Sequence, residues 1–283
     1  MNGCIWITGA STGIGYALAL KCASEGRVVA ASARSLKDLE ALQRAGGDLI
    51  RIYPVDVTSR KAVAAVIDDI RKNEGEIEIA VLNAGIYKAV QAKRFVYEDV
   101  RALVQTNFMG FINCLDTLLP EMVRRRSGHI AVVSSGAGYF GLPHFSAYGA
   151  TKAALINMTE ALYLELAHYG IKVQLICPGF VRTRMTERND IRMPMVMEPC
   201  EAAEYFWKGL HANKFEVTFP RSLLGFVRIF RGLPYWFHFA VIRLWVSNVN
   251  PKVIANNLRS KKKYKVISAA SLALTFMGIA FFT

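Results

Sequence analysis

Cysteine is scarce in this sequence and follows no pattern. The 283 residues include five cysteines, which are scattered along the chain without a C-x-x-C pair. An odd number with such spacing excludes a disulfide framework and a zinc ribbon, and it is typical of a reducing compartment. The five histidines also lack metal-ligand spacing, so we expect no metal ion. Because the N-terminal MNGCIWITGA has no basic region followed by an apolar stretch of signal length, we expect a cytoplasmic protein.

Internal repeats and low-complexity linkers are absent too. Hydrophobic residues make up 53% and charged residues 20% of the sequence, as in an ordinary globular chain and unlike a disordered or fibrous one. The length fits one large α/β domain, alone or with an appendage.

Acidic residues almost disappear from the last quarter of the chain. Residues 205–283 contain 12 Lys and Arg but one acid, Glu216, whereas residues 1–204 contain 23 basic and 21 acidic residues. The same quarter is the most apolar part of the chain. Basic and apolar residues together favour an anionic membrane surface as a partner over a nucleic acid. The run Arg124–Arg126 is expected to end a helix, where positive charge suits the helix dipole, and not to bind nucleic acid.

Six short, β-branched runs alternate with longer segments of helical pattern up to about residue 180. Near-continuously apolar strands that alternate with helices are typical of a parallel sheet covered on both faces. We therefore predict an α/β protein with a Rossmann-type, doubly wound sheet and three layers. The predicted strands are Ile5–Thr8, Val28–Ala33, Ile50–Val55, Ile79–Leu82, Ile130–Val133 and Val173–Ile176. The predicted helices span about 14–25, 36–45, 59–74, 98–126 and 147–169.

This alternation ends at Pro178. We expect a substrate loop at about 180–204 and a short helix around 200–212. The chain is thereby divided into a dinucleotide-binding catalytic domain, residues 1–204, and a basic, hydrophobic helical extension, residues 205–283.

Two segments of the extension suit a membrane. Leu223–Val249 is apolar but interrupted by charges, which favours a pair of interfacial helices broken at Pro234. Val266–Thr283 has 18 residues without a charge and follows the basic cluster Lys261–Lys265. As a helix it would reach roughly 27 Å, enough to cross a thin bilayer, and the basic flank favours the cytoplasmic face. The alternative is a terminal helix that packs on the protein or on a partner chain.

A glycine-rich turn, T-G-A-S-T-G-I-G, joins the first predicted strand to the first predicted helix. Its glycines allow a tight turn and let the backbone approach a pyrophosphate at a helix N-terminus, where free N–H groups favour anions. A turn that merely needs glycine is the alternative, but the position between strand and helix favours a dinucleotide. The cofactor-binding residues predicted here are Gly9, Ser11, Thr12, Gly13, Ile14 and Gly15.

The second predicted strand ends in A-S-A-R-S, without an acidic residue. An acid at this place would bind both ribose hydroxyls of NAD, whereas Arg34 can bind a 2′-phosphate. We therefore predict NADP(H) as the cofactor in preference to NAD(H). The alternative for Arg34 is a solvated surface charge.

Ser135, Tyr148 and Lys152 form the candidate catalytic group. Tyr148 and Lys152 lie one turn apart on one face of a predicted helix. A phenol with a pKa near 10 needs a neighbouring cation to act as an acid–base catalyst at neutral pH, and Lys152 can supply it. Ser135 can donate a hydrogen bond to the substrate oxygen.

The order and spacing of these motifs resemble the classical short-chain dehydrogenases/reductases over about residues 3–185. The further shared motifs are D-V-T, N-A-G, Q-T-N-F-M-G, V-V-S-S, Y-G-A-T-K and C-P-G-F-V-R-T. One departure is Leu82, where the family often has a second asparagine before N-A-G. The resemblance implies an NADP-dependent oxidoreductase acting on CH–OH groups, and a homodimer or tetramer that pairs through the helices containing Asn107 and Tyr148.

The resemblance also implies a role for each matching residue. Tyr148 would be the general acid in carbonyl reduction or the base in alcohol oxidation, Lys152 would lower its pKa and hold the nicotinamide ribose, and Ser135 would polarise the carbonyl. Asn107 would hold a water in the proton relay, although it could instead cap or kink its helix. In the cofactor site, Asp56 and Val57 would flank the adenine, Asn83 and Gly85 would line the ribose, and Pro178, Val181 and Thr183 would contact the nicotinamide end.

The family shapes its substrate pocket with the segment after Pro178, which is apolar and rich in methionine in this chain. Such a lining suits a large, flexible, hydrophobic substrate, although the methionines could also only pack a lid. The residues concerned are Phe180, Met185, Met193, Met195, Val196, Met197, Phe206 and Trp207. His144, between Ser135 and Tyr148, either borders the substrate pocket or is an isolated polar residue.

Three functions are compatible with these features. The first is a membrane-associated enzyme of lipid metabolism that interconverts a ketone and a secondary alcohol on a 3-oxoacyl, ketosphingoid, steroid or retinoid compound. The second is a soluble reductase of 3-oxoacyl thioesters whose basic tail meets an acidic carrier protein. The third is a non-catalytic scaffold that senses NADP(H), which the complete set of candidate catalytic residues disfavours.

Overall fold

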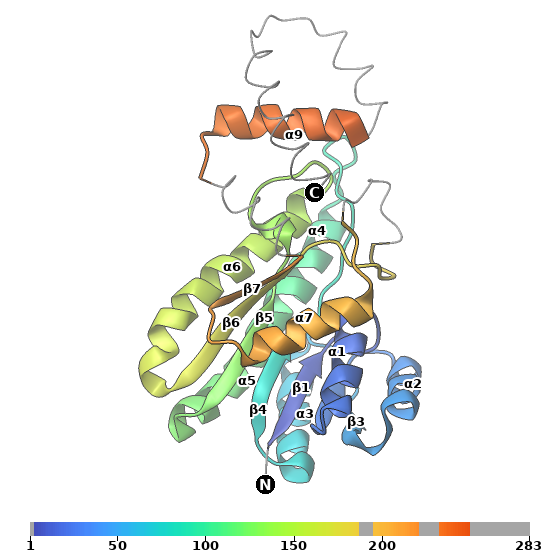
Figure 1. Ribbon diagram of the computed structural model, residues 1–283, viewed down its shortest axis with the longest axis vertical. Coiled ribbons are helices and arrows are strands. Elements are labelled where there is room, and N and C mark those ends of the chain that lie inside the picture. Colours follow the sequence, from blue (N-terminus) through green and yellow to red (C-terminus); the bar gives the residue numbers. More distant parts are fainter. Residues whose placement is uncertain (1–2, 187–194, 221–231, 250–283) are drawn as a thin grey trace, which may run out of the picture.

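The computed structural model describes residues 3–186, 195–220 and 232–249 of the chain. In these residues, seven parallel strands form one sheet in the order β3-β2-β1-β4-β5-β6-β7 (Figure 1). The strands are β1 (Cys4–Thr8), β2 (Val29–Ser32), β3 (Ile50–Ile52), β4 (Ile77–Leu82), β5 (Gly128–Val133), β6 (Ile171–Pro178) and β7 (Glu216–Phe219). All six predicted strands are present, and the predicted doubly wound parallel α/β fold is confirmed.

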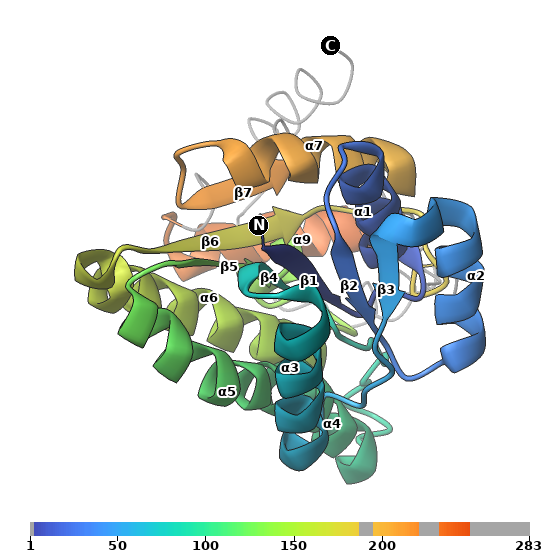
Figure 2. The same cartoon turned by 90° about the horizontal axis from the view of Figure 1, so that it is seen from below.

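Helices cover both faces of the sheet, which Figure 2 shows from below. One face has α1 (Gly13–Ser24), α2 (Leu36–Gly46) and α7 (Pro199–His211), and the other has α3 (Arg60–Glu74), α4 (Tyr97–Val104), α5 (Gly110–Arg125) and α6 (Ser146–Leu166). Each face has its own hydrophobic core. In β1, Ile5 and Ile7 belong to the core beneath α1, while Cys4 and Trp6 belong to the core beneath α3 and α5. This alternation explains why a strand buried on both sides reads as an uninterrupted apolar run.

Two elements differ from the sequence prediction. The strand β7, which pairs with β6, is not predicted by the sequence pattern, and it continues the sheet past residue 204. The predicted helix 98–126 is present as one continuous helical segment, but it contains a π-helical stretch, Gln105–Met109, between α4 and α5 that the sequence does not predict. The helix expected around 200–212 is present as α7.

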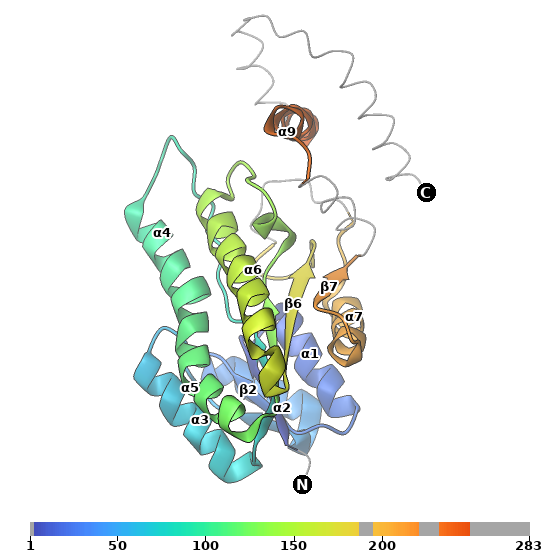
Figure 3. The same ribbon diagram turned by 90° about the vertical axis from the view of Figure 1, so that its left-hand side faces the viewer.

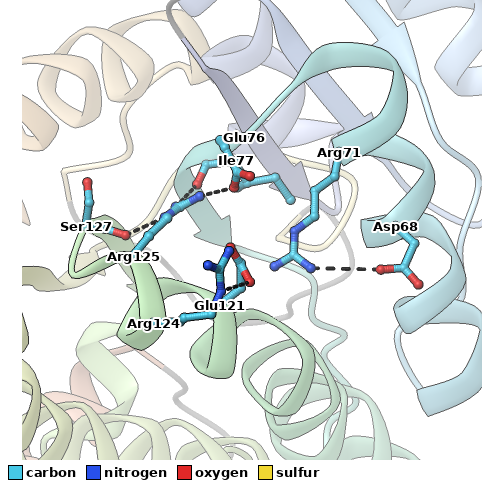
Figure 4. A network of polar contacts seen from close by, with 8 residues as sticks. All are labelled: Asp68, Arg71, Glu76, Ile77, Glu121, Arg124, Arg125 and Ser127. Carbon is cyan, nitrogen blue, oxygen red and sulfur yellow. Dashed lines mark hydrogen bonds and ion pairs between the residues drawn. The ribbon is translucent and has the colours of Figure 1, made fainter.

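A set of arginine contacts fastens the end of α5 to the start of β4 (Figure 4). Arg125 donates hydrogen bonds to the backbone oxygens of Ser127 and Ile77, each at 2.6 Å, and pairs with the carboxylate of Glu76. The next residue, Arg126, adopts a left-handed conformation with φ 53° and caps the helix. The basic run therefore ends a helix, as expected.

The helix α9 (Tyr235–Val249) follows Pro234, where the sequence predicts a helix break. It lies across the carboxyl end of the sheet and is seen end-on above β6 in Figure 3. Among the described residues, no helix has both the length and the apolar character needed to span a membrane. The predicted membrane segment Val266–Thr283, its basic flank and residues 223–231 of the predicted helix pair lie outside the described residues.

Candidate active site

A cavity of about 570 Å³ opens at the carboxyl ends of the strands, the usual place for a ligand in this kind of sheet. It brings together the three candidate catalytic residues Ser135, Tyr148 and Lys152. Thirteen further residues of the predicted cofactor site also line it: Gly9, Ser11, Thr12, Gly13, Ile14, Arg34, Asp56, Val57, Asn83, Gly85, Pro178, Val181 and Thr183.

The glycine turn forms one end of this cavity. Gly9 and Gly13 have φ values of 70° and 61°, a conformation that favours glycine. The helix α1 begins at Gly13, and the side chain of Thr12 makes no capping hydrogen bond. The first N–H groups of α1 are therefore not capped by Thr12 and suit an anionic group of a ligand.

Gly15 serves packing instead of lining the cavity. A Cβ atom at this position would lie 2.4 Å from the backbone oxygen of Gly9 and 2.7 Å from Nδ2 of Asn83. A glycine here lets α1 approach the ends of β1 and β4 closely, which is consistent with the close helix–strand approach in dinucleotide-binding folds. Gly15 is the one residue of the predicted turn that the structure places away from the cavity lining.

Thr8 is a positioning residue that the sequence analysis missed. Its Oγ1 accepts hydrogen bonds from the backbone nitrogens of Asn83, at 3.0 Å, and Ala84, at 3.1 Å. In return, Nδ2 of Asn83 donates to the backbone oxygens of Thr8 and Gly9. These contacts hold the ends of β1 and β4 together at the point where the strand order reverses.

Arg34 is exposed and lines the cavity, two residues after the end of β2. The side chain of Ser35 caps α2 by accepting from the backbone nitrogen of Asp38. Asp38 also lines the cavity, and its carboxylate pairs with Arg184 at 3.6 Å. Two guanidinium groups thus stand at this end, one of them beside a carboxylate.

Tyr148 and Lys152 project from α6 toward the end of β5. The ammonium of Lys152 lies 5.8 Å from the centroid of the Tyr148 ring and donates a hydrogen bond of 2.9 Å to the carbonyl of Val133. Burial lowers the pKa of Lys152 to about 8. Burial also raises the pKa of Tyr148 to about 12, although hydrogen bonding with Ser135 acts in the opposite direction. Burial is the largest influence on this phenol, so its pKa lies above its usual value and not below it as expected.

Asn107 is buried in the π-helical segment between α4 and α5. Its Oδ1 accepts from the backbone nitrogen of Ile86 at 2.8 Å, and its Nδ2 donates to the Ile86 carbonyl and to Thr151 of α6. A Cβ on Gly85 would lie 3.3 Å from this Oδ1 and 3.6 Å from Nζ of Lys152. The side chain lies behind the cavity wall, next to the lysine, in a helical irregularity that often marks functional sites.

The apolar and aromatic residues of the cavity lining form its candidate substrate end. They are Tyr87, Phe140, Leu142, Phe145, Phe180, Met185, Val241 and Ile242. His144 is not among the lining residues, and it has a φ of 69° with its carbonyl accepting from the backbone nitrogen of Val90.

The methionine-rich segment contributes less to this lining than expected. Only Phe180 and Met185 of its described residues reach the cavity. Met197 and Phe206 are buried in the core, while Met195 is exposed. Val196 and Trp207 do not line the cavity, and Met193 lies outside the described residues.

No group of three or more histidine, cysteine or acidic side chains that could hold a metal ion occurs among the residues whose placement is described. The polar lining of the cavity includes hydroxyls, amides and cations, together with the carboxylates of Asp38 and Asp56.

Comparisons with known proteins agree with this geometry. The family model described as short chain dehydrogenase matches residues 3–193. An uncharacterized oxidoreductase of Myxococcus xanthus is 38% identical over 231 residues, covering 81% of this chain and 91% of that protein. The 3-oxoacyl-acyl-carrier-protein reductase FabG of Thermotoga maritima is 36% identical and covers 64% of this chain and 75% of its own. The 17-beta-hydroxysteroid dehydrogenase 13 of Rattus norvegicus is 32% identical, with 76% and 74% covered.

Solved structures match the same region. A short-chain dehydrogenase from Streptomyces avermitilis superposes with a TM-score of 0.72 and 26% identity, covering 90% of this chain and 99% of its own. A short-chain dehydrogenase from Sphingobium yanoikuyae in complex with NADPH has a TM-score of 0.70 and 28% identity, covering 77% and 88%.

Proposed function

The chain belongs to the short chain dehydrogenase family, and from that premise we propose that it transfers hydride between NADP(H) and a hydrophobic ketone/secondary alcohol pair. It is an oxidoreductase with a nicotinamide cofactor. One observation carries the proposal. Ser135, Tyr148 and Lys152 line the same cavity as the uncapped glycine turn of α1, with the apolar substrate end beside them.

In the proposed mechanism, the nicotinamide supplies the hydride when it is bound. The hydroxyl of Tyr148 donates its proton to the carbonyl oxygen, and the hydroxyl of Ser135 donates a hydrogen bond to the same oxygen. Lys152 would hold the nicotinamide ribose and would stabilise the phenolate that remains after proton transfer. Asn107 positions the Ile86 backbone beside the lysine, where a water of the proton relay would be held.

The proposed cofactor roles are those that the family resemblance implies for residues of the cavity lining. The N-terminus of α1 would take the pyrophosphate, and Arg34 would pair with a 2′-phosphate, since no acid stands at the end of β2 to take the ribose hydroxyls. The remaining contacts are assigned as Asp56 and Val57 to the adenine, Asn83 and Gly85 to the ribose, and Pro178, Val181 and Thr183 to the nicotinamide end.

The proposed substrate is lipid-like because the walls beyond Tyr148 are apolar. We also propose that the extension associates with a membrane on its cytoplasmic face. Two observations support this. Residues 205–283 contain 12 basic residues and one acid, and Tyr235 and Trp236 on α9 are exposed. Pairing of copies through α4, α5 and α6 is supported by exposed apolar side chains such as Val104 and Leu164.

The test is oxidation of NADPH and of NADH in mixed micelles with long-chain 3-oxoacyl, ketosphingoid, steroid and retinoid carbonyls. Tyr148→Phe is expected to abolish turnover, because the proton donor is lost. Tyr163→Phe is the matched control, since Tyr163 lies on the same helix and is 44% exposed. Binding of NADPH without turnover of any carbonyl would contradict the proposal and favour a scaffold that only senses the cofactor.

A carrier-protein reductase is the second candidate function. The similarity to FabG and the basic extension, which could meet an acidic carrier, support it. A kcat/KM at least tenfold higher for the carrier-bound 3-oxoacyl thioester than for the free thioester, lost at high salt, would favour this candidate. Equal values for the two substrates would exclude it.

A further inference from the structure

The helix α9 completes the wall of the cavity although it lies outside the matched family region, residues 3–193. It crosses the carboxyl end of the sheet in Figures 1 and 3. Two consecutive residues of α9, Val241 and Ile242, line the same cavity as Tyr148. Their exposed fractions are 6% and 8%, so these side chains are buried even though the helix lies at the periphery.

The contacts of α9 are made with the chain segment that connects Ser135 to Tyr148. Val241 and Ile242 form a cluster with Phe140 and Leu142, both of which line the cavity as well. The ring of His238 meets the ring of Phe140 edge-on, with centroids 5.0 Å apart. Burial lowers the pKa of His238, which favours its neutral form in this contact. The helix is thus held against the substrate end of the site by apolar contacts.

The two sides of α9 differ in environment. Val241 and Ile242 are buried against the cavity, whereas Tyr235, Trp236 and Phe239 are 77%, 66% and 52% exposed. The inward side presents aliphatic groups to the cavity, where Phe140 and Leu142 pack with them. A substrate reaching this end would therefore bury an apolar group and not a charged one.

We propose that Val241 and Ile242 are specificity-determining residues that contact the apolar end of the substrate, away from its carbonyl. This inference rests on the proposed function and deepens it, because it proposes that residues of α9 determine the preferred chain length of the substrate. When the carbonyl of the substrate lies at Tyr148, its apolar chain extends past Phe140 and Leu142 to Val241 and Ile242. Each further methylene buried along this path strengthens binding about fourfold. The gain ends where the two side chains close the cavity.

Substitutions that change the volume at this end test the assignment. Val241→Trp shortens the path, so we expect kcat/KM for a 3-oxododecanoyl thioester to fall about 10- to 100-fold while that for a 3-oxobutanoyl thioester stays within about twofold. Ile242→Ala lengthens the path and is expected to move the preferred chain length upward. Phe239→Trp is the control. It places an indole ring on the exposed side of α9 and is expected to leave the chain-length profile unchanged.

Binding measurements separate a failure of this inference from a failure of the proposed function. The affinity of the 3-oxododecanoyl thioester is measured by calorimetry in the wild type and in Val241→Trp, both with NADP+ present. If no carbonyl is turned over but the thioester binds Val241→Trp more weakly than the wild type, the proposed function fails, while the role of α9 in substrate binding stands. If all variants share one chain-length profile and one affinity, with unfolding temperatures like the wild type, the assignment of α9 is overturned.

Discussion

At neutral pH, the buried charge of Lys152 is expected to lower the free energy of unfolding of the protein. Its side chain is 4% exposed, and its Nζ donates to the carbonyl of Val133. Burial lowers its pKa from 10.5 to about 8, so at pH 7 the folded protein carries a buried cation. The substitution Lys152→Met removes this cation and keeps an unbranched side chain of similar length.

The magnitude follows from the difference in pKa between the folded and unfolded states. A lowering from 10.5 to about 8 corresponds to about 3 kcal/mol against the charged form. Between these two pH values the unfolded chain binds a proton that the folded chain does not, so the free energy of unfolding rises with pH in this window. Below pH 8 the full penalty applies. We therefore expect the free energy of unfolding of Lys152→Met, minus that of the wild type, to be about 3 kcal/mol larger at pH 7 than at pH 10.5.

The assay is urea unfolding of both proteins at several pH values from 7 to 10.5, without nucleotide. Taking the difference between the two proteins cancels the titration of groups that both contain. Lys61→Met, which removes an exposed lysine on α3, is the control for general loss of positive charge. Carbonyl reduction is expected to be lost in Lys152→Met and kept in Lys61→Met. A difference between Lys152→Met and the wild type that does not vary with pH would refute the reasoning, because Lys152 would then not hold a buried charge.

Three further substitutions test other parts of the molecule. Arg34→Ala is expected to raise the KM for NADPH about 10- to 100-fold and to leave the KM for NADH nearly unchanged, because only NADPH has a 2′-phosphate to pair; equal effects on both would refute its role. Buried His129, bonded to Gln174, has its pKa lowered from 6.5 to about 4, so the wild type should lose about 3 kcal/mol of stability as the pH falls across this range. His129→Gln should lose less in acid denaturation. Asn107→Ala removes the bonds to Ile86 and should lower the free energy of unfolding by about 2–4 kcal/mol in urea; a loss below about 1 kcal/mol would contradict a structural role.

The fold could be predicted from the sequence where burial acts on a whole element. The strands β1, β2, β4, β5 and β6 are buried over most of their length on both faces, so most of their positions are apolar and the pattern is visible in one chain. The strand β7 escaped prediction because it has four residues, of which Glu216 and Thr218 are polar and only two are buried. Its place in the sheet depends on pairing with β6 and on contact with α7, neither of which leaves a local signal.

The π-helical segment between α4 and α5 was missed for a similar reason. The segment Gln105–Met109 contains neither proline nor glycine, so its pattern continues the helix. Its side-chain contacts come from residues that are distant in sequence, since Asn107 bonds the backbone of Ile86 and the hydroxyl of Thr151. Propensity cannot predict such a local adjustment, because tertiary contacts override it.

The residues of the candidate site likewise include some that could be predicted from the sequence and others that could not. Residues that act through backbone geometry, such as Gly9 and Gly13, have a fixed order along the chain and could be found from it. The wall formed by α9 could not, because Val241 and Ile242 resemble the exposed apolar residues on the same helix until Phe140 is placed beneath them. Apolar residues on two sides of one helix indicate that two surfaces are covered or bound, but not which one faces the site. Since the substrate end is built by this contact between distant segments, the reaction class could be inferred from motifs, whereas substrate length has to be measured at α9.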